Sequence, residues 1–99
     1  MAKTDWTQDE LVKLFEALDV QCIELMKKKN SDYGNSWAHM RRTSLTDEML
    51  IKVLRIRQLE DLQAQGLAPQ VSEGIEAELR DIRNYAAFRY IQETEVNHV

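Results

Sequence analysis

Two acidic side chains stand three residues apart in the segment EAELRDIRNY. In a helix, Glu78 and Asp81 would share one face, which Asn84 and Tyr85 continue one turn later. Mg²⁺ prefers oxygen ligands and retains water, so one or two helical carboxylates together with substrate phosphates are enough to hold it. A solvated acidic helix face has the same pattern. The pair therefore predicts a magnesium site only if other residues support it.

Basic side chains lie among apolar ones in the preceding segment, SLTDEMLIKVLRIRQLE. Lys52 and Arg55 stand on one face there, and Arg57 and Glu60 lie nearby. Long basic side chains at core positions need carboxylates, phosphates or water as partners. Antiparallel packing of the two segments would bring Lys52 and Arg55 opposite the acidic pair. The resulting polar seam is either a structural ion-pair network or a site where bases bind phosphates and acids hold a metal ion.

The stretch KKKNSDYGNSW, residues 27 to 37, supplies a third group of candidates. Its short polar residues and its glycine predict a helix end and a loop. A loop alone does not need two aromatic rings, so the stretch is either a wall for a planar ligand or a plug for a small core, and Trp37 is large enough to be the plug. The three lysines fall in the last turn of a predicted helix, where they would compensate its dipole. The candidate binding residues are Asn30, Asp32, Tyr33, Asn35 and Trp37.

Zinc binding and covalent catalysis are not expected. His39 and His98 are far apart in the sequence, and no cysteine accompanies either of them. The sequence contains no glycine-rich phosphate loop, and no serine or cysteine has the surroundings of a nucleophile. Any hydrolysis would be metal-assisted attack by water.

Three long helices must position these residues, over about 7–29, 46–65 and 73–93, with a loop and a short turn over 30–45. In the first helix, apolar residues recur at spacings of three and four from Leu11 to Met26, which is typical of one buried face. The predicted helix caps are Thr7 with Glu10 for the first helix, Ser44 or Thr46 at the start and Gly66 at the end of the second, and Ser72 for the third.

The composition indicates one small all-α domain over residues 1–99. The chain has 43% hydrophobic residues, three glycines and one proline, too few turn residues for a β-sandwich or barrel. Its formal net charge of −4 gives no basic field for duplex nucleic acid. One cysteine cannot form an internal disulfide, and no run is apolar enough to cross a membrane, so we expect a cytoplasmic protein. The middle helix is apolar around much of its circumference, which predicts a homodimer.

Together the three segments resemble a small all-α family called nucleotide modification associated domain 1, found in bacteria and phages. The likeness covers roughly residues 8 to 92, and Asp-Tyr-Gly-x-x-Trp over 32–37 is its most specific element. The family is linked to nucleotide metabolism largely by genomic association. More distantly, the layout is similar to the all-α nucleoside triphosphate pyrophosphatases of the MazG and dimeric dUTPase kind. In those enzymes, acids on two helices bind magnesium and water attacks between phosphates.

The resemblance implies a protein that binds a nucleoside or deoxynucleoside phosphate with Mg²⁺. Glu78 and Asp81 match the second acidic pair of the pyrophosphatases. The first acidic cluster has no clean counterpart, because basic residues stand where carboxylates are expected and Glu48 and Glu60 are the only acids near that face. The resemblance therefore supports nucleotide binding more than hydrolysis.

The resemblance also gives roles to the aromatic stretch. Tyr33 and Trp37 would border the base, Asn30 or Asn35 would read its edge, and Asp32 would bind a sugar hydroxyl or the base. Two alternatives to a pyrophosphohydrolase stay open. One is a protein that sequesters nucleotides or nucleotide-like signals without turnover, and the other is a structural helical dimer that contacts another protein.

Overall fold

The computed structural model describes residues 3–69 and 73–95, and every regular element in those ranges is a helix. The elements are α1 (Gln8–Tyr33), the short 3-10 helix η1 (Ser36–His39), α2 (Arg42–Ala64) and α3 (Ile75–Thr94). The all-α class predicted from the sequence is confirmed. No helix of the described part is long and apolar enough to span a membrane.

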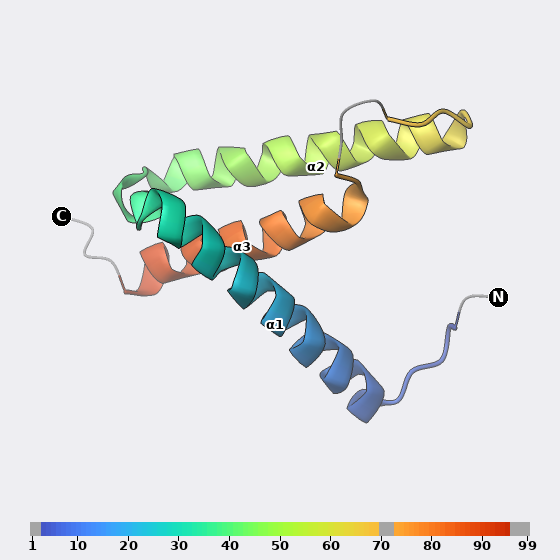
Figure 1. The fold of residues 1–99 in the computed structure, drawn as a ribbon, viewed down its shortest axis with the longest axis horizontal. Coiled ribbons are helices and arrows are strands. Elements are labelled where there is room, and N and C mark those ends of the chain that lie inside the picture. The colour runs from blue at the N-terminus through green and yellow to red at the C-terminus, as the bar shows by residue number, and fades with distance from the viewer. Residues whose placement is uncertain (1–2, 70–72, 96–99) are drawn as a thin grey trace.

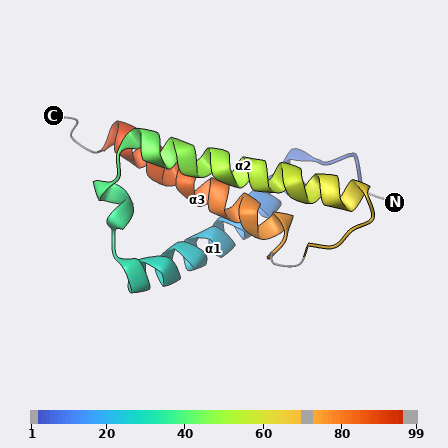
Figure 2. The ribbon, with the colours of Figure 1, turned by 90° about the horizontal axis from the view of Figure 1, so that it is seen from above.

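The three long helices form an α2–α3 hairpin crossed by α1. In both views α2 and α3 lie side by side and run in opposite directions (Figures 1 and 2). Helix α3 packs against both other helices and also contacts η1. The carboxyl-terminal half of α1 lies against α3, whereas its amino-terminal half extends away from the hairpin (Figure 1). This arrangement makes α3 the platform on which the other elements meet.

Helix α1 ends later than predicted, and the reason is Gly34. Its φ of 66° is a conformation that glycine adopts without strain, and its N–H donates to the Asn30 carbonyl at 2.8 Å. Asn30, Asp32 and Tyr33 are therefore helical and do not belong to a loop. The prediction that the lysines of residues 27–29 compensate the dipole in the last turn was wrong, because that turn contains no basic residue.

The helix caps were predicted with mixed success. Thr7 caps α1, because its hydroxyl accepts the Glu10 N–H at 3.1 Å. Gly66 ends α2 as predicted: its N–H donates to the Gln63 carbonyl, and that of Leu67 donates to the Leu62 carbonyl.

The predicted start of α2 was wrong. The helix begins at Arg42 after Arg41, without a side-chain cap. Ser44 and Thr46 lie inside the helix, and the Thr46 hydroxyl donates to the Arg42 carbonyl at 3.2 Å instead of capping the first turn. Helix α3 starts at Ile75 after Gly74, and its predicted cap, Ser72, lies outside the described residues.

The core of the chain is small. Within the described ranges, the buried apolar side chains are Cys22, Leu45 and Leu59. The predicted apolar face of α1 is covered only in its second half, since Leu11 and Phe15 are 40% and 58% exposed. The first half is uncovered because α3 contacts α1 only where the two helices cross (Figure 1).

Candidate functional site

A charged cleft lies where all three long helices meet. Its volume is about 690 Å³. It lies between the carboxyl-terminal end of α1, the middle of α2 and the amino-terminal end of α3. The side chains that line it are Leu25, Lys29, Lys52, Arg55, Glu73, Ala77, Glu78, Arg80 and Asp81. The polar seam expected from antiparallel packing of the last two helices is therefore present, and it borders an open cleft.

Lys52 is at the centre of this seam. Its Nζ lies 3.0 Å from Asp81 Oδ2 and 3.4 Å from Glu78 Oε2. All three side chains are only 13–14% exposed. Asp81 also accepts an ion pair from Lys29, whose Nζ lies 3.1 Å from Oδ1. Both carboxylate oxygens of Asp81 thus face an ammonium group.

The surroundings shift the pKa values of Asp81 and Lys52 in opposite directions. Burial raises the pKa of Asp81, but the hydrogen bonds and charges of Lys52 and Lys29 outweigh burial, so that its pKa is lower than usual. Burial likewise lowers the pKa of Lys52, but Asp81 and Glu78 outweigh it and leave the pKa above its usual value. Both groups are held in their charged forms.

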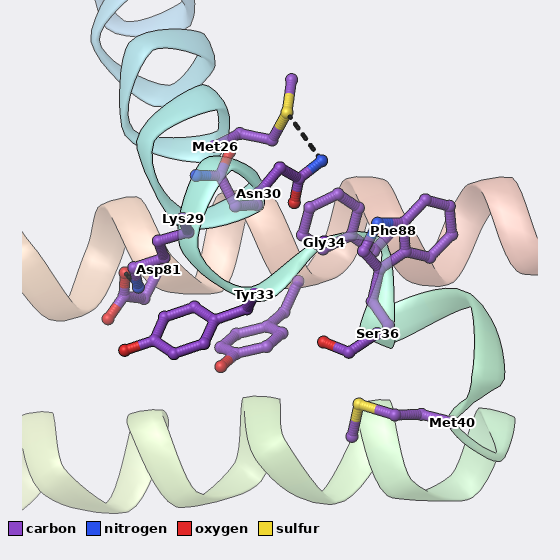
Figure 3. Close-up of a pocket in the computed structure, with 12 residues that line it drawn as sticks. Met26, Lys29, Asn30, Tyr33, Gly34, Ser36, Met40, Asp81 and Phe88 are labelled. Carbon is purple, nitrogen blue, oxygen red and sulfur yellow. Dashed lines mark hydrogen bonds and ion pairs between the residues drawn. The ribbon is translucent and has the colours of Figure 1, made fainter.

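An aromatic pocket adjoins the charged cleft. It encloses about 150 Å³ between the end of α1, η1 and α3. Its lining residues are Met26, Lys29, Asn30, Tyr33, Gly34, Ser36, Trp37, Met40, Asp81, Asn84, Tyr85 and Phe88. Figure 3 shows Lys29 and Asp81 together at one end and Phe88 at the other. The Lys29–Asp81 pair therefore belongs to the walls of both cavities.

Trp37 is held in the pocket wall by α3. Its ring stacks on Phe88 at 4.6 Å between centroids and 11° between planes. Gln92, which is 2% exposed, donates from Nε2 to the carbonyls of Trp37 at 3.0 Å and Met40 at 2.9 Å. These bonds fix η1 on α3. Trp37 thus packs against α3 at the bundle end and lines the pocket, while the role of its ring as a wall for a planar ligand stays a prediction.

The asparagines of the pocket are also oriented by hydrogen bonds. Asn30 Nδ2 donates to Asn35 Oδ1 at 3.1 Å. Figure 3 shows the contact of Asn30 Nδ2 with the Met26 sulfur. Asn84 Nδ2 donates to the Cys22 carbonyl at 3.1 Å and so ties α3 to α1. Asn35 supports the pocket through Asn30 without lining it.

Besides Asn35, four further predicted candidates lie outside both cavities. Asp32 lines a separate shallow hollow on α1 with Glu24 and the neighbouring lysines. Glu48, Arg57 and Glu60 are on α2 but line neither the charged cleft nor the aromatic pocket. The structure brings together Lys52, Arg55, Glu78 and Asp81 in one cavity, and Asn30, Tyr33, Trp37, Asn84 and Tyr85 in the other.

Several residues of the site were missed by the sequence analysis, among them Arg80, which lines the charged cleft. Lys29 was interpreted as part of a dipole-compensating run, although it pairs with Asp81. Phe88 lies seven residues after Asp81, on the same face of α3, so helical spacing could have identified it. No sequence signal pointed to Gln92, whose partners are more than fifty residues away.

The acids of the charged cleft give a partial fit to a magnesium ion. Within the described residues, no group of three or more His, Cys, Asp or Glu side chains could hold a metal. Glu78 Oε2 is buried and accepts no hydrogen bond, and its nearest cation is Lys52. This oxygen and the Asp81 carboxylate provide two ligands of the type Mg²⁺ prefers, and phosphate oxygens and water would have to supply the others.

Comparison with known proteins points to a family. A family model described as nucleotide modification associated domain 1 matches residues 29–92. This range begins at Lys29 and ends at Gln92, so it contains the Lys29–Asp81 pair and the α3 contacts that fix η1. The amino-terminal part of α1 lies outside it. No curated protein and no solved structure matches the chain.

Proposed function

Because the chain belongs to the nucleotide modification associated domain 1 family, we propose that it binds a nucleoside phosphate together with Mg²⁺. The base occupies the aromatic pocket and the phosphates occupy the charged cleft. The observation that carries this proposal is that the two cavities adjoin at the Lys29–Asp81 pair, so one ligand can extend across both.

The aromatic pocket has the chemistry of a base site. A cavity of about 150 Å³ accommodates benzene in another protein, so one aromatic ring can enter a space of this size. Tyr33, which is 73% exposed, offers a ring face at the pocket wall. Asn30 and Asn84 keep amide groups there that can bind the edge of a base. Stacking and amide hydrogen bonds are the two interactions by which proteins bind a single base.

The charged cleft has cations available for phosphates. Arg55 and Arg80 line it, and neither forms an ion pair with another residue of the described chain. Guanidinium groups bind phosphate oxygens through paired hydrogen bonds. Glu78 and Asp81 would hold Mg²⁺ against these phosphates, and Lys52, which now pairs with both acids, would then neutralise phosphate charge. Mg²⁺ supplies charge neutralisation between the acids and the phosphates.

The same site suits hydrolysis less well than binding. Of the three acids that line the cleft, Glu73, Glu78 and Asp81, only the last two pair with Lys52, and no three acids of the described residues are grouped so that they could hold a metal ion. The acids Glu48 and Glu60 of α2 do not line the cleft. We therefore propose a nucleotide-binding role without rapid turnover, such as sequestration. Phosphate and pyrophosphate release from a panel of nucleoside triphosphates with Mg²⁺ tests this distinction. Release at enzymatic rates would establish a pyrophosphohydrolase instead.

A thermal-shift panel tests binding itself. A ligand that binds only the native protein raises Tm, and the rise grows with its concentration. We expect nucleoside triphosphates with Mg²⁺ to raise Tm, and the nucleosides alone to raise it less. If none of these compounds changes Tm, the result would favour the alternative of a structural helical dimer that contacts another protein.

The protein is proposed to act as a homodimer. Large apolar side chains are exposed on α1 and α2, while few are buried in the described core. Burial of such side chains in a subunit interface stabilises the assembly by about 25 cal/mol per Å². Light scattering coupled to size exclusion gives the mass directly, and a monomeric mass at micromolar concentration would contradict this part of the proposal.

A further inference from the structure

The isolated chain exposes much more surface than a compact protein of its size. Its accessible area is 8003 Å², whereas a folded monomer of 11.6 kDa exposes about 5,800 Å². Its radius of gyration is 16.1 Å, compared with about 13 Å for a compact domain of this length. The excess area is larger than the roughly 800 Å² that each partner buries in a standard interface.

A large part of the exposed apolar surface lies on the outward side of α2. Leu50 and Leu54 stand one turn apart and are 55% and 50% exposed, and their neighbours Ile51 and Val53 are 41% and 42% exposed. The opposite side of the helix carries the buried Leu45 and Leu59 and faces α3. We call the residues Leu50, Ile51, Val53 and Leu54 the outer α2 patch.

The charged residues on the same face as this patch suit pairing with an antiparallel second α2. At spacings of three and four, the stripe through Leu50 and Leu54 continues to Asp47 and Thr43 toward the start of the helix and to Arg57 and Asp61 toward its end. Arg42 pairs with Glu93 of α3 and Arg55 lines the charged cleft, so neither belongs to this face.

This pattern distinguishes antiparallel from parallel pairing. Two copies of α2 that run in opposite directions, with a two-fold axis near Ile51, bring Asp47 of each copy beside Arg57 of the other. Parallel copies would bring Asp47, Arg57 and Asp61 each beside the identical residue, and like charges at these distances are unfavourable. A two-fold interface requires a surface complementary to itself, and the outer α2 patch with its flanking charges meets this requirement.

We propose that the outer α2 patch binds a second copy of this chain, with the two α2 helices antiparallel and their two-fold axis near Ile51. Leu50 lies beside the axis and packs against Leu50 and Leu54 of the second copy. The inference rests on the proposal that the protein is a homodimer, and it names the face and the direction. Each copy keeps both of its cavities, because the aromatic pocket is lined by α1, η1 and α3, and α2 lines the charged cleft with Lys52 and Arg55, which are not part of the outer α2 patch.

The apolar amino-terminal half of α1 is the competing surface. Leu14 and Phe15 are 49% and 58% exposed there. The charged residues around this surface over 9–24 are five acids and a single lysine, and Arg83 of α3 pairs with Asp19 and lies over the Phe15 ring, so this face has no complementary set of charges to offer a second copy. The charge pattern therefore favours α2, and α1 remains as a measurable outcome.

Disulfide trapping tests the face. Leu50→Cys and Phe15→Cys are each made in the full-length protein, whose own Cys22 is 4% exposed, and wild type is the control. Under mild oxidation we expect most of the Leu50→Cys protein to form a covalent dimer and little of the Phe15→Cys protein or wild type to do so. Trapping through position 15 and not through position 50 would overturn the proposal.

Mixed trapping tests the direction. Thr43 and Asp61 are exposed near opposite ends of α2, at similar distances from Ile51. An equimolar mixture of Thr43→Cys and Asp61→Cys should give a cross-linked dimer that contains one copy of each, at least tenfold in excess over dimers of either variant alone. Dimers of each variant with itself would show parallel pairing and overturn the proposed direction.

A charge at the patch provides a measurement without oxidation. Leu50→Glu should raise the dimer dissociation constant at least 100-fold, measured by light scattering over a dilution series, while circular dichroism stays helical. Leu79→Glu, which changes an exposed leucine of α3, is the matched control. It should leave the dimer dissociation constant within threefold of the wild-type value. Equal effects of the two substitutions would contradict a specific α2 interface. Nucleotide binding is assayed separately, so failure here leaves the proposed ligand site standing.

Discussion

Lys29 Nζ lies 3.1 Å from Asp81 Oδ1 and thereby joins the end of α1 to the first half of α3. This pair is part of the wall of the aromatic pocket and of the charged cleft (Figure 3). The second carboxylate oxygen of Asp81, Oδ2, forms an ion pair with Lys52 Nζ from α2 at 3.0 Å. A single carboxylate therefore links the three long helices at the point where the two cavities adjoin.

Asp81→Asn should destabilise the protein. The substitution leaves Lys52, only 13% exposed at its side chain, without its closer carboxylate. Removing one partner of a partly buried pair costs about 1–3 kcal/mol, which lowers Tm by several degrees. Thermal melting of wild type and Asp81→Asn, with Asp32→Asn as an exposed control, measures the effect. Equal melting temperatures for Asp81→Asn and wild type would show that the seam contributes little.

Acid should remove the same stabilisation. The pKa of Asp81 is lower in the folded protein than its usual 3.8, so its contribution is complete above the usual value and is lost as pH falls through the folded value. Urea unfolding between about pH 7 and pH 2 should show wild type and Asp81→Asn converging in stability toward the acid end. A difference between the two proteins that stays constant over this range would contradict the ionic role of Asp81.

Gln92→Leu should loosen the aromatic pocket. The substitution removes the Gln92 donor from the carbonyls of Trp37 and Met40, of which Trp37 still accepts the Met40 N–H at 3.2 Å, at a cost of about 1–3 kcal/mol. Urea unfolding should show this loss, and the tryptophan fluorescence of the native protein should change. Gln63→Leu, at an exposed position of α2, is the matched control. If both variants unfold at the same urea concentration, Gln92 does not fix η1.

Tyr33→Ala separates ligand binding from stability. Because Tyr33 is 73% exposed, its removal should change the unfolding free energy by less than about 0.5 kcal/mol. A base that stacks on its ring should lose about 1–3 kcal/mol, which weakens nucleotide binding tenfold or more. Thermal melting and calorimetry on the same preparation check both statements. Unchanged affinity would remove Tyr33 from the base site.

Helical periodicity and side-chain chemistry predicted the elements and the seam. Apolar spacing located all three long helices, and antiparallel packing of the last two correctly brought Lys52 opposite Glu78 and Asp81. These features follow from spacing within a helix and from the direction of neighbouring helices. They need no knowledge of the detailed path of the chain.

The aromatic pocket could be predicted only in part. Polar residues over 30–33 indicated a loop, but the helix continues until Gly34, the first residue that readily accepts a positive φ. That extension places Asn30 and Tyr33 on one helix face and turns Asp32 away from them. The bonds of Gln92 to η1 depend on tertiary approach across more than fifty residues, which local patterns do not encode.

The proposal that one nucleotide spans both cavities is tested most directly by calorimetry with its separate parts. Wild type is titrated, with Mg²⁺ present, with nucleosides, their triphosphates and inorganic triphosphate, and Tyr33→Ala and Arg55→Ala are titrated with the tightest ligand. We expect a nucleoside triphosphate to bind with a Kd of about 10 µM or tighter, at least tenfold more tightly than either part alone, and each variant to weaken it. Inorganic triphosphate binding as tightly as every nucleotide, or no heat from any ligand, would contradict the account.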